Sequence, residues 1–171
     1  MSPGHRSMRV YLLRHATAAP HGSGPDAARP LVEKGWKQVR RVVDFCRVRE
    51  ILPEVVLTSP LVRARETATG FCQGLGLPAP EVVPWLAIGR AAAETPAELD
   101  AWRDHASVCL VGHEPDFSQL AAWFLGTSPG RLDVSKASLL ALDMTRPSTP
   151  GRANLVFFLP NRLMAGGSGP H

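Results

Sequence analysis

The sequence predicts an α/β protein: a three-layer sandwich with a mostly parallel central sheet flanked by helices. Short apolar segments alternate along the chain with longer segments whose apolar residues recur at helical spacing, which is typical of βαβ units. The chain has 171 residues, of which 44% are hydrophobic and 20% charged, as in one ordinary globular domain. We therefore expect a single domain over residues 8–162, with flexible termini at 1–7 and 163–171.

The first half of the chain is predicted to contain two strands and two helices. The segments 9–13 and 54–58 are short, largely apolar and β-prone, as buried strands are. A helix is expected over 32–48, because Trp36, Val39, Val43 and Cys46 form an apolar stripe. Ser59 is expected to cap the second helix, with Pro60 at its first position.

The second half continues the alternation and ends in two strands. Thr95 and Glu98 have the spacing of a capping box, which predicts a helix that runs to about Asp104. A helix from about Pro115 should end at Gly126, since glycine favours helix ends. Strands are expected at residues 107–111, 138–142 and 153–159, and residues 82–83 are expected to form either a short strand or merely extended backbone.

Unusual polar residues follow three of the predicted strands. Arg14 and His15 follow the first, Arg63 lies in the first turn of the helix after the second, and His113 follows the third. Ligands bind outside the carboxyl ends of parallel strands, so we expect the chemistry there. Arginine offers paired donors to phosphoryl oxygens, and a neutral histidine can attack phosphorus. The alternative is that these arginines form surface ion pairs and the histidines cap loops.

Three segments resemble the signatures of the histidine phosphatase superfamily, in order and at fitting spacing. Leu13–Ala16 resembles the RHG motif and Thr58–Ala68 resembles the SPxxRAxxTA motif. Val111–Pro115 resembles the third motif, which contains the family's other histidine. Two further segments resemble the small SixA-type phosphohistidine phosphatase branch. These two further segments are Arg29–Leu31 and Val156–Pro160.

This resemblance implies a phosphoglycerate mutase-like fold and a metal-independent phosphatase without a cofactor. His15 would be the nucleophile that carries the phosphoryl group, and Arg14, Arg63 and His113, the last as an imidazolium, would bind its oxygens. Ser59 and Arg29 are further expected to contact substrate. Phosphate, sulfate or vanadate should bind in the same pocket.

Two positions depart from the family pattern. Ala16 replaces the glycine of the first signature, which matters if the backbone there needs positive φ. In larger members a carboxylate follows the segment that matches residues 83–86, but this chain has Trp85 and no acid until Glu94. The expected proton donors are therefore Asp26 and Glu114.

The leading functional hypothesis is hydrolysis of phosphohistidine on a protein of the histidine-containing phosphotransfer type. A small phosphate ester as substrate and a non-catalytic phosphate-binding adaptor are the alternatives. The net charge of +4 alone does not indicate a nucleic-acid partner, because aromatic residues that would stack on bases do not accompany the arginines. Neither a membrane-spanning segment nor a signal peptide is evident. The three cysteines have no disulfide or metal spacing, which favours buried thiols and a cytoplasmic location.

Overall fold

The computed structural model describes residues 7–145 and 147–164 of the chain. Its centre is a six-stranded sheet in the order β3-β2-β4-β1-β5-β6. The first four strands in this order are mutually parallel, while β5 pairs antiparallel with β1 and with β6. The strands are β1 Met8–Arg14, β2 Val55–Thr58, β3 Glu81–Val82, β4 Ser107–Gly112, β5 Leu139–Met144 and β6 Ala153–Leu159.

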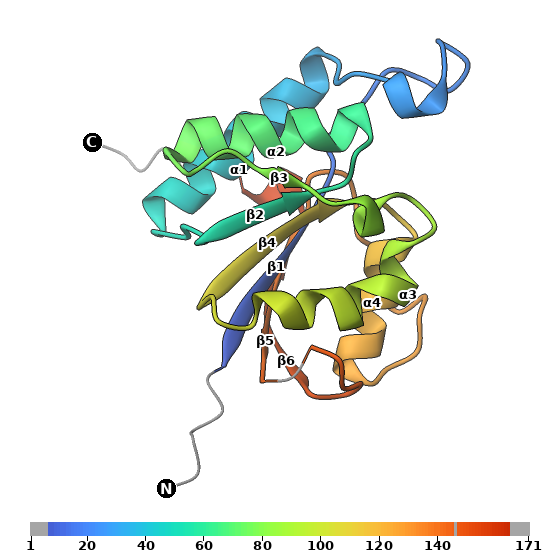
Figure 1. The fold of residues 1–171 in the computed structure, drawn as a ribbon. Coiled ribbons are helices and arrows are strands. Elements are labelled where there is room, and N and C mark those ends of the chain that lie inside the picture. Colours follow the sequence, from blue (N-terminus) through green and yellow to red (C-terminus); the bar gives the residue numbers. More distant parts are fainter. Residues whose placement is uncertain (1–6, 146, 165–171) are drawn as a thin grey trace, which may run out of the picture.

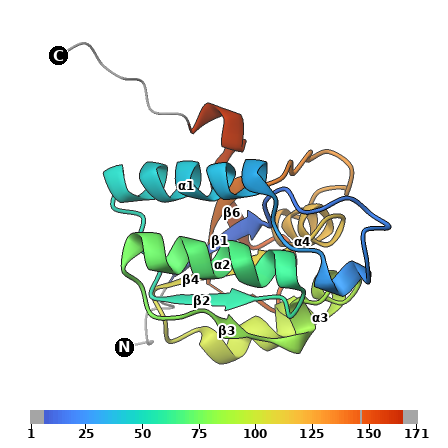
Figure 2. The same cartoon turned by 90° about the horizontal axis from the view of Figure 1, so that it is seen from above.

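Helices cover both faces of the sheet, which confirms the predicted three-layer α/β fold. In Figure 1, α1 and α2 lie on one side of the sheet and α3 and α4 on the other; Figure 2 shows α1 and α2 side by side. The helices are α1 Glu33–Val48, α2 Val62–Leu75, α3 Ala91–Glu98 and α4 Asp116–Leu125. Short 3-10 helices lie at Asp26–Ala28, Pro84–Leu86, Leu99–Trp102 and Asn161–Leu163.

The alternation of side chains along the central strands divides the core into two. On β1, Tyr11 and Leu13 pack in the cluster beneath α1 and α2. Val10 and Leu12 point the other way, into the cluster with α3 and α4, because successive strand residues face opposite sides of a sheet. Both clusters are closed by buried helix residues, so the sheet is held rigidly between two helical layers.

The strand register brings the three polar strand ends together. Arg14 on β1 pairs with Gly112 on β4, and Thr58 on β2 pairs with Val111. The backbone N–H of His15 donates to the Gly112 carbonyl at 2.9 Å, which extends the pairing past the end of β1. Consequently the residues that follow β1, β2 and β4 meet at one edge of the sheet.

Two predicted helix starts are wrong. Helix α2 begins at Val62, and Ser59 does not cap it through its side chain. Helix α3 begins at Ala91, so Thr95 lies inside it and is fully buried. The acceptor at the start of α3 comes from another helix: the Asp116 carboxylate accepts the N–H of Gly89 at 2.7 Å. Because Asp116 lies far from α3 in the sequence, the residues at the start of α3 do not indicate which side chain caps it.

Other local predictions are confirmed. Helix α4 ends before Gly126, which has the left-handed φ of +69° that glycine adopts readily. Cys46, Cys72 and Cys109 are buried free thiols. Burial raises the pKa of Cys46 to about 12 and that of Cys72 to about 11, so both stay protonated at neutral pH.

At the chain ends, the folded part reaches past the expected boundary at residue 162. Met164 is buried in the cluster under α1 and α2. Of the termini expected to be flexible, 1–7 and 163–171, residues 1–6 and 165–171 lie outside the described residues. Within the described residues, the helices are too short or too polar to span a bilayer.

Candidate active site

A pocket of about 240 Å³ opens at the edge where β1, β2 and β4 end. Its lining includes Arg14, His15, Arg29, Arg63 and Glu114. His15 and Arg63 are 6% and 2% exposed, so the groups at its floor are almost wholly removed from water. The His113 ring lies next to that of His15, with 5.2 Å between the ring centroids. Three of the four residues singled out at the strand ends therefore line one pocket, and the fourth, His113, lies directly beside His15.

The hydrogen bonds of His15 determine which of its ring nitrogens is free. Nδ1 lies 2.8 Å from the carbonyl oxygen of Ala16. Because a carbonyl only accepts, Nδ1 carries the proton, and a neutral ring then has its lone pair on Nε2. Nε2 accepts the Nε–H of Arg63 at 3.3 Å, a long contact. The ring nitrogen that carries the lone pair thus faces the Arg63 guanidinium in the pocket.

Burial keeps the His15 ring neutral. It lowers the pKa of His15 to about 3, and the nearby positive charges of Arg63 and Arg14 act in the same direction. The Ala16 carbonyl opposes this shift, because it would stabilise the charged ring. At neutral pH the lone pair on Nε2 is therefore present in almost every molecule.

Thr67 connects the nucleophile's loop to Arg63. Its hydroxyl donates to the Arg63 carbonyl at 2.7 Å and accepts the N–H of Ala16 at 3.0 Å. Ala16 is buried and is not among the described residues with positive φ. Alanine is consequently accommodated where the family signature has glycine, without the backbone strain that a positive φ would bring.

His113 is held by Ser59. Its Nε2 lies 2.7 Å from the Ser59 hydroxyl. Ser59 therefore binds His113 instead of capping α2 as expected. Nδ1 of His113 is buried and has no hydrogen-bond partner among the described residues. Burial, with Arg63, lowers the pKa of His113 to about 4. Burial and the nearby cations thus favour the neutral ring in the free protein, and the imidazolium expected with a bound phosphoryl group stays a prediction.

Arg14 lies partly buried beside the two histidines. Its Nη1 donates to the Val134 carbonyl at 2.8 Å, which orients the guanidinium. Its Nε is buried without a hydrogen-bond partner among the described residues. A buried donor without a partner is costly, and a bound oxyanion would satisfy it.

The two expected proton donors occupy different environments. Glu114 lines the pocket, and burial raises its pKa. Asp26 is exposed, and its hydrogen bond with Arg29 lowers the pKa of its carboxyl, with Arg63 acting in the same direction. A carboxylate bound to two guanidinium groups does not hold a proton to give away. Of the two carboxyls, Glu114 is the one whose surroundings favour the protonated form, and the donor role of each residue stays a prediction.

Asp26 instead positions the arginines. Its carbonyl and carboxylate accept from the two terminal nitrogens of Arg63 at 2.9 and 3.3 Å. Its other carboxylate oxygen accepts from Nε of Arg29 at 2.9 Å. Arg29 is 8% exposed and lines the pocket.

The mouth of the pocket contains residues that were not predicted from the sequence. Lys136, Ile88 and His21 line it, and all three are exposed. Neither a motif nor a strand end marks them in the sequence. Only the tertiary structure brings them to the pocket.

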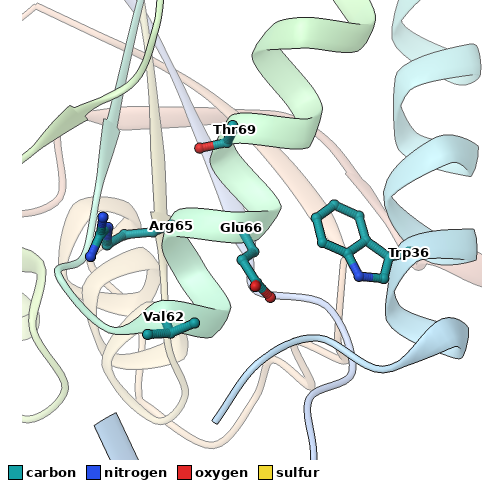
Figure 3. Close-up of a pocket in the computed structure, with 5 residues that line it drawn as sticks. All are labelled: Trp36, Val62, Arg65, Glu66 and Thr69. Atoms are coloured by element: carbon teal, nitrogen blue, oxygen red, sulfur yellow. The ribbon is translucent and has the colours of Figure 1, made fainter. Parts of the chain in front are cut away.

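A separate hollow of about 310 Å³ lies between α1 and α2 (Figure 3). Trp36 of α1 faces it across from a stripe of α2 at helical spacing: Val62, Arg65, Glu66 and Thr69. Trp36 was expected in the apolar stripe of α1, and it is only partly buried because it borders this hollow. The five lining residues include no histidine, whereas His15 lines the strand-end pocket with His113 beside it.

Sequence comparisons link the chain to phosphatases. The sequence profile of the histidine phosphatase superfamily (branch 1) matches residues 10–88. An uncharacterized protein of Picosynechococcus is 33% identical over 139 residues, which cover 79% of this chain and 84% of that protein. Phosphohistidine phosphatase SixA of Escherichia coli is 29% identical over 142 residues, which cover 80% and 86%.

Solved structures show the same fold. The protein histidine phosphatase SixA complexed with tungstate superposes with a TM-score of 0.82 at 25% identity, over 92% of this chain and 99% of that one. A putative phosphohistidine phosphatase SixA from Agrobacterium tumefaciens gives 0.75 at 27% identity, over 90% and 97%.

Proposed function

The chain belongs to the SixA-type branch of the histidine phosphatase superfamily, and on that premise we propose that it hydrolyses phosphohistidine on proteins through a phosphoryl intermediate on His15. The observation that carries the proposal is the neutral His15 ring, whose Nε2 lone pair lies beside Arg63. A nucleophile of this kind splits one difficult displacement into two easier ones.

In the first step, His15 Nε2 attacks phosphorus. The N–P bond to His15 forms while the P–N bond to the substrate imidazole breaks, and the substrate leaves as neutral imidazole. Arg14, Arg63 and the free ring nitrogen of His113 bind the three equatorial oxygens, where charge develops. In this proposal guanidinium groups supply the positive charge, so the reaction needs no metal ion.

In the second step, water attacks the phosphorus of phosphorylated His15. The P–Nε2 bond breaks, the water gives up a proton to solvent or to deprotonated Glu114, and inorganic phosphate leaves. The Ala16 carbonyl keeps the proton on Nδ1. His15 therefore departs as a neutral ring rather than as an imidazolate anion, which makes it a good leaving group.

Two features support a protein phosphohistidine as substrate. The mouth of the pocket is open, since Lys136, Ile88 and His21 are exposed there. The leaving group also needs little acid catalysis, because imidazole titrates near pH 6.5 and solvent can protonate it before the P–N bond breaks. A single half-buried carboxyl, Glu114, is then sufficient.

The proposal is tested with a phosphohistidine-bearing protein and a generic aryl phosphate. Denaturant quenching during turnover is expected to trap a phosphoryl group on the protein that is labile in acid and stable in base, as a phosphoramidate is. His15→Ala is expected to abolish both trapping and turnover, and vanadate to inhibit the wild type. Turnover of the aryl phosphate alone would refute the phosphohistidine assignment, and turnover by His15→Ala would refute the mechanism.

A further inference from the structure

Lys136 is a cation at the pocket mouth that the proposed chemistry does not use. It lines the pocket and is exposed, and the described residues form no ion pair with it. One carboxylate oxygen of Glu114, which also lines the pocket, accepts the N–H of Ser118 at 2.8 Å, and among the described residues Glu114 forms no ion pair with Lys136. The site therefore presents an uncompensated positive charge to whatever enters the pocket.

The backbone ties Lys136 to the nucleophile. The N–H of the next residue, Ala137, lies 3.1 Å from the Arg14 carbonyl and 3.3 Å from that of His15. Ala137 has a φ of +56°, which side chains other than glycine rarely adopt, and it is fully buried. Strained backbone of this kind persists only where the surrounding contacts fix it. The backbone that carries Lys136 is thus anchored beside His15.

The electrostatics around Lys136 favour an anion. Burial lowers its pKa, and the positive charges of Arg14, Arg29 and Arg63 lower it further. The floor of the pocket already offers two arginines and His113 to a phosphoryl group, and these are far less exposed than Lys136. An anion that meets Lys136 therefore lies nearer to solvent than the phosphoryl group does.

We infer that Lys136 determines substrate preference by binding a carboxylate that lies beside the phosphohistidine on a protein substrate. This inference rests on the proposed function, and it adds an acidic surface around the target histidine as the feature that the protein recognises. An exposed charge pair of this kind is expected to change kcat/KM about fivefold.

Two synthetic phosphohistidine peptides test the inference: one has Asp at the two positions on each side of the phosphohistidine, and the other has Asn. At low salt the wild type is expected to favour the Asp peptide by about fivefold in kcat/KM, mainly through KM. This ratio should approach one in 0.5 M salt, which screens exposed charges. Lys136→Gln should remove the preference, Lys136→Arg should keep it and Lys136→Glu should reverse it.

Lys37→Gln is the matched control, since Lys37 is exposed, pairs with Glu33 and lies outside the pocket; its preference should equal that of the wild type. A preference that persists in Lys136→Gln, or is missing in the wild type, would overturn the inference and leave the proposed function intact. If the wild type cleaves neither peptide but does cleave an aryl phosphate, the proposed function fails, and the inference fails with it.

Discussion

At the scale of single residues, catalysis depends on how Ala16 is held. Its carbonyl orients His15 while its N–H donates to the Thr67 hydroxyl. Thr67→Val keeps the volume but leaves that buried N–H without a partner, which costs about 1–3 kcal/mol. We expect lower unfolding free energy by urea titration and slower phosphoenzyme formation. Thr67→Ser, which keeps the hydroxyl, should restore both, and a full-rate Thr67→Val enzyme would contradict the positioning role.

The two carboxylates near the pocket should differ in their effects. Glu114→Gln removes the proton donor, so turnover of an alkyl phosphate should fall by about 10²–10⁴ while that of phosphohistidine falls much less. Asp26→Asn loosens Arg63 and Arg29, which should raise KM for both substrates alike. Steady-state kinetics on both substrates separates these outcomes. Equal losses on the two substrates in Glu114→Gln would show that P–N cleavage also needs the acid.

At the scale of elements, Asp116 connects α4 to the start of α3. It is 3% exposed, and its carboxylate accepts the N–H groups of Gly89 and Ala92. Asp116→Ala leaves these helix-start donors without an acceptor and should destabilise the protein by about 1–2 kcal/mol. Because Ile88 precedes Gly89 and lines the pocket, KM should also rise. Asp116→Asn keeps one acceptor oxygen, so its melting temperature should fall less than that of Asp116→Ala. An equal fall in the two variants would contradict the capping role.

The helix starts also show what local sequence predicts and what it does not. Strand and helix periodicity predicted every long element, and Gly126 correctly marked the end of α4. The predicted caps at Thr95 and Ser59 were wrong, although both residue types are common helix caps. Thr95 lies inside α3, and the Ser59 hydroxyl binds His113. The hydrogen-bond partner of a polar side chain is set by the tertiary structure. The spacing of residues in the sequence does not reveal that partner.

At the scale of the whole molecule, the strand order makes the site. Arg14, His15, Arg63 and His113 could be singled out because parallel strands end at one edge, so their convergence follows from topology. The roles of Asp26 and Lys136 could not be predicted in this way, since loops carry them and loop paths depend on contacts such as those of Ala137. The sheet places the strand-end residues of the site, and the loops bring Asp26 and Lys136 to it.

The buried histidines should also make the whole fold sensitive to acid. Folded His15 and His113 have pKa values of about 3 and 4, below the ordinary value of 6.5. Between these values the unfolded chain binds more protons, so the free energy of unfolding rises with pH up to about 6.5 and then levels. Stability is therefore complete above pH 6.5 and is lost as pH falls toward 4.

The measurement is the urea midpoint at several pH values from 5 to 7.5; the raised pKa of Glu114 acts in the opposite direction. The midpoint should rise steadily and then level near pH 6.5. His15→Asn and His113→Asn each remove one buried titrating ring, so each should flatten the slope, and the double variant should flatten it most. A slope unchanged in the double variant would mean that these rings accept protons in the folded protein, and the neutral nucleophile would have to be abandoned.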